Sequence, residues 1–166
     1  MSHEDAHEKA EIGQDQYLLF YVGGDIYAIK ALSTSEIVEY TTITKVPLMP
    51  SFVKGVTNIR GNIVPVIDLR DRFNLGKTEV QAKTSIVVIN YKTENETTQL
   101  GIIIDEVYEV DDINTDQIKD SPPFGAKIDK KFISHMGKYQ GDYIAILDTQ
   151  AILNTTELSK LVKGCA

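Results

Sequence analysis

The amino-acid sequence predicts an all-β protein with a few short helices, built from small barrels. Many short runs of β-forming residues follow one another at short spacing. Glycine-containing turns separate several of these runs, and few segments show the apolar period of a helix. The 166 residues are enough for two five-stranded barrels that share a core, whereas alternating strand–helix units fit this pattern less well.

The first elements follow an acidic tail. Residues 1–15 have no apolar periodicity and are expected to be disordered. Two strand-like runs then lie within residues 16–31, on either side of Gly23-Gly24-Asp25. Because glycine readily takes the positive φ angles of tight turns, this spacing predicts a hairpin.

The segment that follows is less regular. Ser33 can cap a single helical turn, while residues 37–43 have the composition of a strand. Residues 45–55 contain two prolines and are expected to form a loop that carries apolar side chains. The sequence leaves open where the strand of this segment begins.

A second hairpin is predicted in the middle of the chain. Residues 56–60 and 63–69 are strand-like and flank Gly61-Asn62, a suitable two-residue turn. A short helical turn is expected to follow and to end at Gly76.

The second half is predicted to contain three strands and two helices. The strands are expected at residues 83–92, 99–110 and 143–149, with a polar turn at 93–98. Asp129 can cap a helix over residues 130–136 that ends at Gly137, and Asn154 can cap a C-terminal helix with an apolar stripe of Leu158, Leu161 and Val162. A single domain is therefore expected over residues 16–163, with approximate lobes 16–80 and 81–163 and possible strand exchange between them.

Charge and cysteine content restrict the classes of partner. The net charge of −7 without a basic run argues against nucleic acid and against anionic membranes. Cys165 is the only cysteine, so an internal disulfide is excluded and a reducing, cytoplasmic location is expected. The sequence shows no signal peptide and no apolar run long enough to span a bilayer.

Patterns that would indicate catalysis or a metal are weak. His3 and His7 lie in the tail, and His135 is expected to be an ordinary surface or half-buried residue. Asp112, Asn114 and Asp116 match the start of a calcium loop, but Gln117 and Pro123 replace the glycine and glutamate that it needs. The carboxylates of Asp105, Glu106, Asp111 and Asp112 are interpreted as surface charge. The chain is therefore expected to be no enzyme and to need no cofactor or metal.

Arg60 is a lone cation within the most apolar part of the sequence. Alternation along a strand would put Val56, Asn58 and Arg60 on one face. Arg60 can form a structural salt bridge, with Glu36 as the candidate partner, or it can bind a partner protein, and the residues alone do not decide between these roles. Pro65 suggests an edge strand or a bulge, and edge placement with surplus apolar surface favours a docking site.

Two glycines near Arg60 also allow two interpretations. Gly55 and Gly61 can serve turn geometry, or they can leave room for another backbone to approach closely. For Gly61 the turn is the safer interpretation.

Several segments together resemble the CheW family of bacterial chemotaxis coupling proteins. In chain order they are "YAI", "EIVEY", "KVPLMPSFVKGVTNIRGNIVPVIDLRDRF", "GIIIDEVYEV" and "PPF". The resemblance extends over about residues 16–162. It implies two SH3-like five-stranded β-barrels that share a core. It also implies a non-catalytic scaffold that couples chemoreceptors to the regulatory domain of the histidine kinase CheA, within cytoplasmic signalling arrays at the membrane.

The resemblance also implies which residues contact the receptor. Glu36, Gly55 and Arg60 match positions tied to receptor coupling, and Lys54, Val56 and Asn58 lie beside them. No short motif assigns the kinase-binding residues. The segment before Glu36, "KALSTS", is more polar than is usual in the family, and the chain has no receiver segment of the CheV type.

Two alternatives remain open from the sequence. One is a CheW-like scaffold of another chemosensory pathway, such as twitching motility, that acts on a different kinase. The other is a small β-barrel enzyme or ligand-binding protein, which would need a deep pocket with convergent polar groups.

Overall fold

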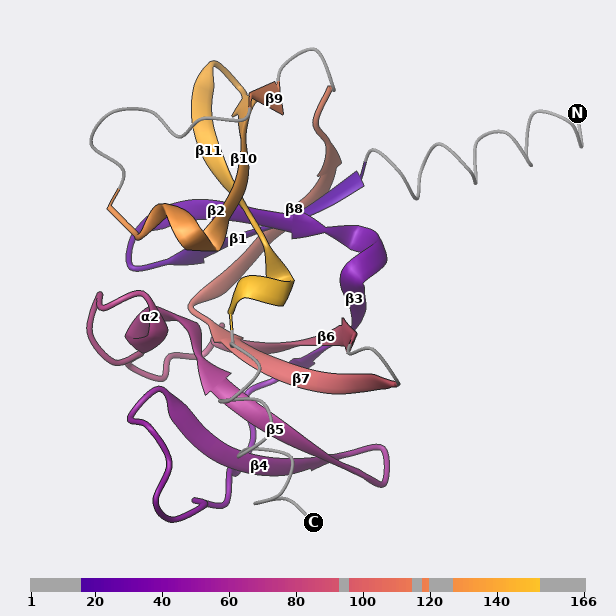
Figure 1. Cartoon of the computed structure of the whole chain (residues 1–166), viewed down its shortest axis with the longest axis vertical. Helices are drawn as coiled ribbons and strands as arrows, with labels where there is room; N and C mark the ends of the chain where they lie inside the picture. Colours follow the sequence, from indigo (N-terminus) through magenta and orange to yellow (C-terminus); the bar gives the residue numbers. More distant parts are fainter. Residues whose placement is uncertain (1–15, 93–95, 115–117, 120–126, 153–166) are drawn as a thin grey trace, which may run out of the picture.

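The computed structural model describes residues 16–92, 96–114, 118–119 and 127–152, which form two β-sheets with short helical turns (Figure 1). Sheet A has the order β8-β1-β2-β11-β10-β9, and sheet B has the order β3-β6-β7-β5-β4. The strands of sheet A are β1 Gln16–Val22, β2 Asp25–Lys30, β8 Glu106–Asp112, β9 Ile118–Lys119, β10 Ile133–Tyr139 and β11 Asp142–Leu147. The strands of sheet B are β3 Thr34–Glu39, β4 Val53–Ile59, β5 Asn62–Asp68, β6 Ser85–Lys92 and β7 Thr97–Ile104. The helical turns are η1 Ala31–Ser33, α2 Leu69–Arg72, η3 Lys130–Phe132 and η4 Thr149–Ala151.

These elements confirm the predicted all-β class with a few short helices. Sheet B has the expected five strands, and sheet A has six because the two-residue β9 adds to its edge. Both sheets contain strands from before and after residue 80, so lobes drawn at 16–80 and 81–163 would exchange strands, and that division stays a prediction.

Three hairpins have two-residue turns with positive φ at both positions. The φ angles are 60° and 89° at Gly23-Gly24, 52° and 87° at Arg60-Gly61, and 50° and 88° at Gln140-Gly141. Such turns match the right-handed twist of the strands that they join. The hairpin at Gly23-Gly24 is confirmed. The central hairpin is confirmed too, but its turn lies one residue earlier than predicted, and Asn62 is already the first residue of β5.

The hydrophobic core forms three clusters, and the strands supply them by alternation. The largest cluster lies between the sheets and takes Leu18 and Phe20 from β1 and Val87 and Ile89 from β6. The other face of sheet A packs Tyr17 and Leu19 into a second cluster, and the other face of sheet B packs Ile86 and Val88 into a third. We call sheet A with the second cluster barrel A, and sheet B with the third cluster barrel B. The two barrels therefore share the first cluster, as the sequence predicted.

The two sheets are built alike. β5 pairs in parallel with β7, and β11 pairs in parallel with β2. One row of cross-strand partners in sheet B is Glu36, Val88, Gly101 and Val66. The matching row in sheet A is Glu109, Leu19, Ala28 and Ile146. These rows put edge strand β8 in the position of β3, and they put the β10–β11 hairpin in the position of the β4–β5 hairpin. The two hairpins lie at opposite ends of the molecule (Figure 1).

The prediction of a helix over residues 130–136 is wrong beyond its first turn. Asp129 does cap a helical turn, since its side chain accepts a hydrogen bond from the Lys131 N–H, but that turn is η3 alone. Residues 133–139 form β10 and pair with β11. A helix of so few residues gains little by itself, whereas the strand gains a full set of cross-strand partners.

The prediction of one long strand over residues 99–110 is also wrong. The chain leaves sheet B at the end of β7 and enters sheet A with β8. Asp105 holds this crossing, because its N–H donates to the Tyr21 carbonyl at 3.0 Å and its Oδ2 accepts from the Gly23 N–H at 2.8 Å. No glycine or proline separates β7 from β8, so the sequence does not mark the boundary, although β7 ends in a buried run and β8 is half-buried to exposed.

The structure also decides the uncertain elements of the first half. Ser33 is the last residue of η1, and β3 occupies Thr34–Glu39 instead of residues 37–43. The helical turn before Gly76 is confirmed as α2, which Asp68 caps by accepting from the Asp71 N–H. Pairing of β3 along β6 sets both ends of this strand.

Pro65 does not lie on an edge strand, contrary to the prediction. β5 lies between β4 and β7, and β4 is the edge. Pro65 faces Val56, whose N–H and carbonyl both bond to Thr44. β5 pairs with β7 from Val66 onward. Pro65 lies just before this pairing begins, so its missing backbone N–H is tolerated within the sheet.

Several predictions lie outside the described residues. They are the disordered tail, the C-terminal helix from Asn154, the calcium-loop positions Asp116, Gln117 and Pro123, the "PPF" segment, and Cys165.

Candidate protein-interaction site

Glu36 and Arg60 join the two edges of sheet B. Arg60 Nε donates to Glu36 Oε2 at 2.6 Å, from the turn of the β4–β5 hairpin to edge strand β3. β3 and β4 are the first and last strands in the order of this sheet, so the contact bridges the open side of barrel B. The candidate ion pair that the sequence suggested is therefore present.

This ion pair lies at the surface and contributes little to stability. The side chain of Arg60 is 79% exposed and that of Glu36 is 20% exposed. An ion pair exposed to this extent stabilises a protein by about 1 kcal/mol at most, because solvent screens it. This hydrogen bond uses the Nε–H of the guanidinium and does not involve the terminal Nη donors. The pair therefore orients a planar, charged group at the surface and contributes little to the stability of the fold.

The sequence predicted that Arg60 shares a strand face with Val56 and Asn58, and this prediction is wrong. Arg60 lies in the turn with φ of 52°, a value that is uncommon for a residue other than glycine. The side chain of Asn58 accepts from the Gly61 N–H at 2.9 Å, which stabilises this turn. Gly61 has φ of 87°, and no atom lies within 4 Å of the position that a Cβ would take. Turn geometry therefore explains Gly61, as predicted.

Gly55 has the second role that the sequence allowed. A Cβ on Gly55 would lie 1.9 Å from the Thr44 carbonyl oxygen. Thr44 and Val56 exchange two backbone hydrogen bonds of 2.8 Å each, and the Thr57 hydroxyl donates to the Thr42 carbonyl at 2.9 Å. The approaching backbone is thus the chain's own segment 42–44, which covers the outer edge of β4.

The remaining site residues lie on the outer face of the hairpin. Lys54 and Val56 are half-buried and Asn58 is exposed, whereas Gly55, Thr57 and Ile59 are buried on the inner side. The structure therefore places Asn58 beside the Arg60 turn, with Lys54 and Val56 further along the same strand. All six predicted receptor residues belong to β3 or to the β4–β5 hairpin.

Sequence reasoning missed two apolar residues of this surface. Ile63 lies directly opposite Asn58 and is 54% exposed, and Ile37, next to Glu36 on β3, is 41% exposed. The alternation of β3 contained the signal for Ile37. Nothing local distinguished Ile63 from Ile67 on the same strand, and Ile67 is fully buried.

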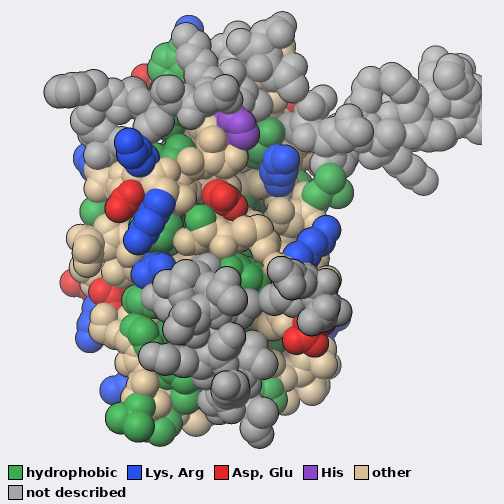
Figure 2. Space-filling model, in the orientation of Figure 1, with side chains coloured by type: hydrophobic (Ala, Val, Ile, Leu, Met, Phe, Trp, Pro, Cys, Tyr) green, Lys and Arg blue, Asp and Glu red, His purple; other side chains and the backbone are tan. Residues whose placement is uncertain are grey.

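Charges of both signs are interspersed on the face shown in Figure 2, without one large patch of a single sign. This distribution fits protein contacts better than a phosphate backbone, which needs clustered cations.

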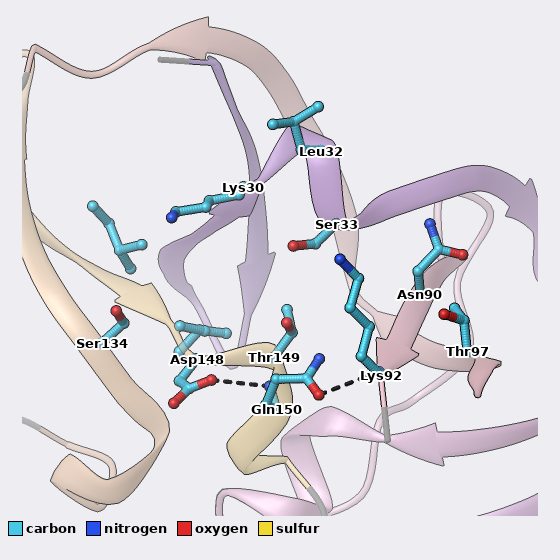
Figure 3. A pocket seen from close by; sticks show the side chains of 12 residues that line it. Lys30, Leu32, Ser33, Asn90, Lys92, Thr97, Ser134, Asp148, Thr149 and Gln150 are labelled. Carbon is cyan, nitrogen blue, oxygen red and sulfur yellow. Dashed lines mark hydrogen bonds between the residues drawn. The ribbon is translucent and has the colours of Figure 1, made fainter. Parts of the chain in front are cut away.

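A groove of about 510 Å³ lies where the ends of the two sheets meet (Figure 3). It is lined by Lys30, Leu32, Ser33, Asn90, Lys92, Thr97, Ser134, Ile146, Leu147, Asp148, Thr149 and Gln150. Gln150 bridges its floor, because its N–H donates to Asp148 Oδ1 at 3.0 Å and its Oε1 accepts from the Lys92 N–H at 3.2 Å. Most lining groups are short polar side chains that come from several different elements.

The carboxylates interpreted as surface charge have structural contacts. Asp105 holds the crossing into sheet A, Glu106 pairs with Lys83 at 3.1 Å, and Asp111 contacts the Tyr139 hydroxyl. His135 is half-buried, as expected, although on a strand. Within the described ranges no group of three His, Cys, Asp or Glu side chains could hold a metal ion. No helix of the described part is long and apolar enough to cross a membrane.

Comparison with known proteins agrees with this fold. The family model of the CheW-like domain matches residues 16–157. The chemotaxis protein CheW of Klebsiella aerogenes is 30% identical over 148 residues, which cover 89% of this chain and 86% of that protein. The crystal structure of the scaffolding protein TtCheW from Thermoanaerobacter tengcongensis superimposes with a TM-score of 0.76 at 29% identity, over 86% of this chain and 90% of that one. The likeness agrees with two SH3-like subdomains.

Another relative, less similar in sequence, has a different name. Protein PilI of Pseudomonas aeruginosa is 24% identical over 110 residues, which cover 66% of this chain and 60% of that protein.

Proposed function

The chain belongs to the CheW family of non-catalytic chemotaxis scaffold proteins, and from this premise we propose that it couples chemoreceptors to the regulatory domain of the histidine kinase CheA. The observation that carries the proposal is the exposed Arg60–Glu36 pair. It lies at the residues that the family resemblance associates with receptor coupling, and its exposure leaves it little role in stability.

The receptor surface in this proposal is the outer side of the β3 edge and the β4–β5 hairpin. It comprises Glu36, Lys54, Val56, Asn58 and Arg60, with Ile37 and Ile63 as exposed apolar residues of the same strands, while Gly55 is a receptor-site residue that lies buried beneath this surface. Exposed apolar side chains next to a rigidly held arginine suit a protein partner, because the apolar area supplies affinity and the guanidinium supplies orientation. Gly55 acts indirectly in this proposal, since it lets segment 42–44 cover the edge of β4 and keep the hairpin in place.

The kinase contacts a different surface, which leaves the receptor surface available. Two similar barrels whose hairpins lie at opposite ends of the molecule suit head-to-tail contacts with a partner of like architecture, and such contacts generate rings and arrays. Each contact can be weak, because many contacts act together in an array. The protein would work in the cytoplasm, held at receptor arrays by protein contacts alone.

An NMR titration of the labelled chain tests the proposal. The CheA regulatory domain is added first, and a fragment of the receptor tip is added afterwards. Two separate sets of shifted resonances are expected, and the receptor set should include Gly55 and Arg60. Absence of shifts with both partners would contradict the proposal while leaving the family assignment intact.

The likeness to PilI supports a second candidate, a scaffold of another chemosensory pathway that acts on a different kinase. Pull-down of the full chain with the histidine kinases encoded by the same organism would separate the two. Retention of a kinase other than the chemotaxis kinase would favour this second candidate.

A further inference from the structure

Barrel A is bridged at its open side by a tyrosine instead of an ion pair. The Tyr139 hydroxyl, at the end of β10, lies 2.7 Å from Glu109 Oε1 and 2.8 Å from Asp111 Oδ2 on β8. Burial and these two carboxylates raise the pKa of Tyr139 well above its usual value, so the hydroxyl keeps its proton. A phenol has one hydrogen to donate, so only one of the two carboxylates can receive it. Asp111 Oδ1 also accepts from the Asp112 N–H at 2.8 Å, and Gln140 Nε2 donates to the Tyr139 hydroxyl at 3.5 Å. Of the two oxygens that face the hydroxyl, Glu109 Oε1 and Asp111 Oδ2, one is therefore left without a donor among the described residues.

At the corresponding position in barrel B, a guanidinium donates to the carboxylate. Glu109 holds in sheet A the position that Glu36 holds in sheet B, in the row of cross-strand partners described above. Glu36 receives the guanidinium of Arg60, but the turn residue that corresponds to Arg60 is Gln140, which is uncharged. Neither Glu109 nor Asp111 forms an ion pair within the part of the chain that the structure describes. Among the described residues, barrel A therefore has the acidic side chains of such a contact and no basic side chain that pairs with them.

Two further tyrosine rings extend from Tyr139, whose hydroxyl contacts these carboxylates. The rings of Tyr21 and Tyr108 meet edge to face at 5.7 Å, and those of Tyr108 and Tyr139 meet edge to face at 6.3 Å. Tyr108 is 37% exposed and Glu109 is exposed, so a partner can reach both. Tyrosine faces beside carboxylates favour a guanidinium, which stacks on rings and donates several hydrogen bonds in one plane.

Exposed apolar side chains in the two barrels also correspond. Val110, next to Glu109, is 50% exposed, as Ile37 next to Glu36 is 41% exposed. Tyr143 is 45% exposed on β11, at the place that Ile63 holds on β5. Strand alternation puts Val110 and Tyr143 on the face of sheet A opposite to Glu109, Asp111 and Tyr139, so they extend the likeness of the barrels without lining the acidic cluster.

We propose that the acidic tyrosine surface, formed by Tyr21, Tyr108, Glu109, Asp111 and Tyr139, binds an arginine of a partner protein that presents it from a β-hairpin turn, as this chain presents Arg60. The guanidinium supplies the donors that the single hydroxyl of Tyr139 cannot supply. A lysine fits less well, because its ammonium cannot stack on the rings and bridge two carboxylates in one plane. This surface lies on the barrel opposite to the receptor surface, and the inference does not depend on receptor coupling.

A pair of matched peptides tests this inference on the full chain. The probe is a cyclic peptide with the sequence of residues 56–65, which includes Arg60 and its turn. Cyclisation is needed because an isolated hairpin is only marginally stable in water. The control peptide has citrulline in place of arginine, with nearly the same shape and no charge. We expect the arginine peptide to shift the side-chain resonances of Glu109, Asp111 and Tyr139 and to bind roughly ten-fold more tightly than the control.

Protein variants complete the test. Glu109→Gln with Asp111→Asn keeps acceptors for the Tyr139 hydroxyl but removes both charges, so the preference for arginine over citrulline should disappear. The Tm should stay equal or rise, because two like charges near one hydroxyl are removed. Glu36→Gln, the same change in barrel B, should leave the preference intact. Equal binding of the two peptides, a preference that survives the double substitution, loss of the preference with Glu36→Gln, or a lowered Tm of the double variant would overturn the inference.

Discussion

Substitution of Arg60 should separate receptor coupling from stability. In Arg60→Ala the 2.6 Å contact with Glu36 is lost and the backbone stays in the left-handed region at φ of 52°. Arg60 is 79% exposed, so the lost contact is worth about 1 kcal/mol at most. For a chain of this size, that change lowers the Tm by about 2–4 °C.

Arg60→Gly is the matched variant. It removes the same guanidinium but relieves the left-handed strain, which costs an L-residue about 1–2 kcal/mol, although glycine also makes the unfolded chain more flexible. The Tm of Arg60→Gly should therefore be equal to or higher than that of Arg60→Ala. If the guanidinium itself contacts the receptor, both variants should lose receptor affinity by the same factor.

The assay is a binding titration of each variant with a receptor-tip fragment, beside a thermal melt under the same conditions. Glu36→Gln serves as a third variant, since it leaves Arg60 in place without its acidic partner and should lower affinity less. A variant series in which affinity follows Tm would refute the reasoning and make Arg60 a structural residue. So would affinity restored in Arg60→Gly, because glycine restores the backbone and not the charge.

Three further substitutions test the placement of single residues by thermal melts. Val66→Asp buries an unpaired charge at a fully buried position and should abolish cooperative folding. Ile63→Asp on the same strand, at a position 54% exposed, should change the free energy of unfolding by less than about 0.5 kcal/mol. Similar melting curves for the two variants would refute the placement of β5. Gly55→Ala puts a Cβ 1.9 Å from a carbonyl oxygen and should cost about 3 kcal/mol or more, from backbone strain and two lost hydrogen bonds; a Tm within about 2 °C of the parent would contradict this close approach. Thr34→Val removes a buried hydroxyl that has no hydrogen-bond partner and should stabilise the chain by about 1 kcal/mol, so a lowered Tm would show that the hydroxyl is bonded after all.

The unpartnered Thr34 hydroxyl gives a physical meaning to a departure that the sequence already showed. Thr34 lies in the segment "KALSTS" before Glu36, where the resemblance to the family led us to expect a less polar composition. Its Oγ1 is buried at the start of β3 and has no hydrogen-bond partner within the described part of the chain. Polarity at this position therefore reduces stability, and the structure shows no compensating contact among the described residues.

The sequence by itself determined the all-β class, several of the strands, and the hairpins β1–β2 and β4–β5. These features depend on neighbours in the chain. Alternation of side chains has a period of two, and paired glycines such as Gly23-Gly24 take positive φ without strain. The ion pair of Glu36 with Arg60 was also among the expected contacts, since a lone cation in an apolar segment needs an acidic or carbonyl partner.

Only the tertiary structure decided which strands pair and where the boundaries fall. The pattern of β7 and β8 could not show that the chain changes sheets at Asp105, because no glycine or proline separates the two strands and the sheet that each strand joins depends on partners far away in the chain. The residues before Gly137 were predicted as a helix but form β10, because they pair with β11, which lies later in the chain. Arg60 lies in a turn and not on a strand, because the two-residue turn that fixes the pairing of β4 with β5 begins one residue earlier than the sequence pattern suggested. The likeness of Glu109 to Glu36, and with it the second candidate surface, appears only when the rows of cross-strand partners are compared, since no local pattern relates the two residues.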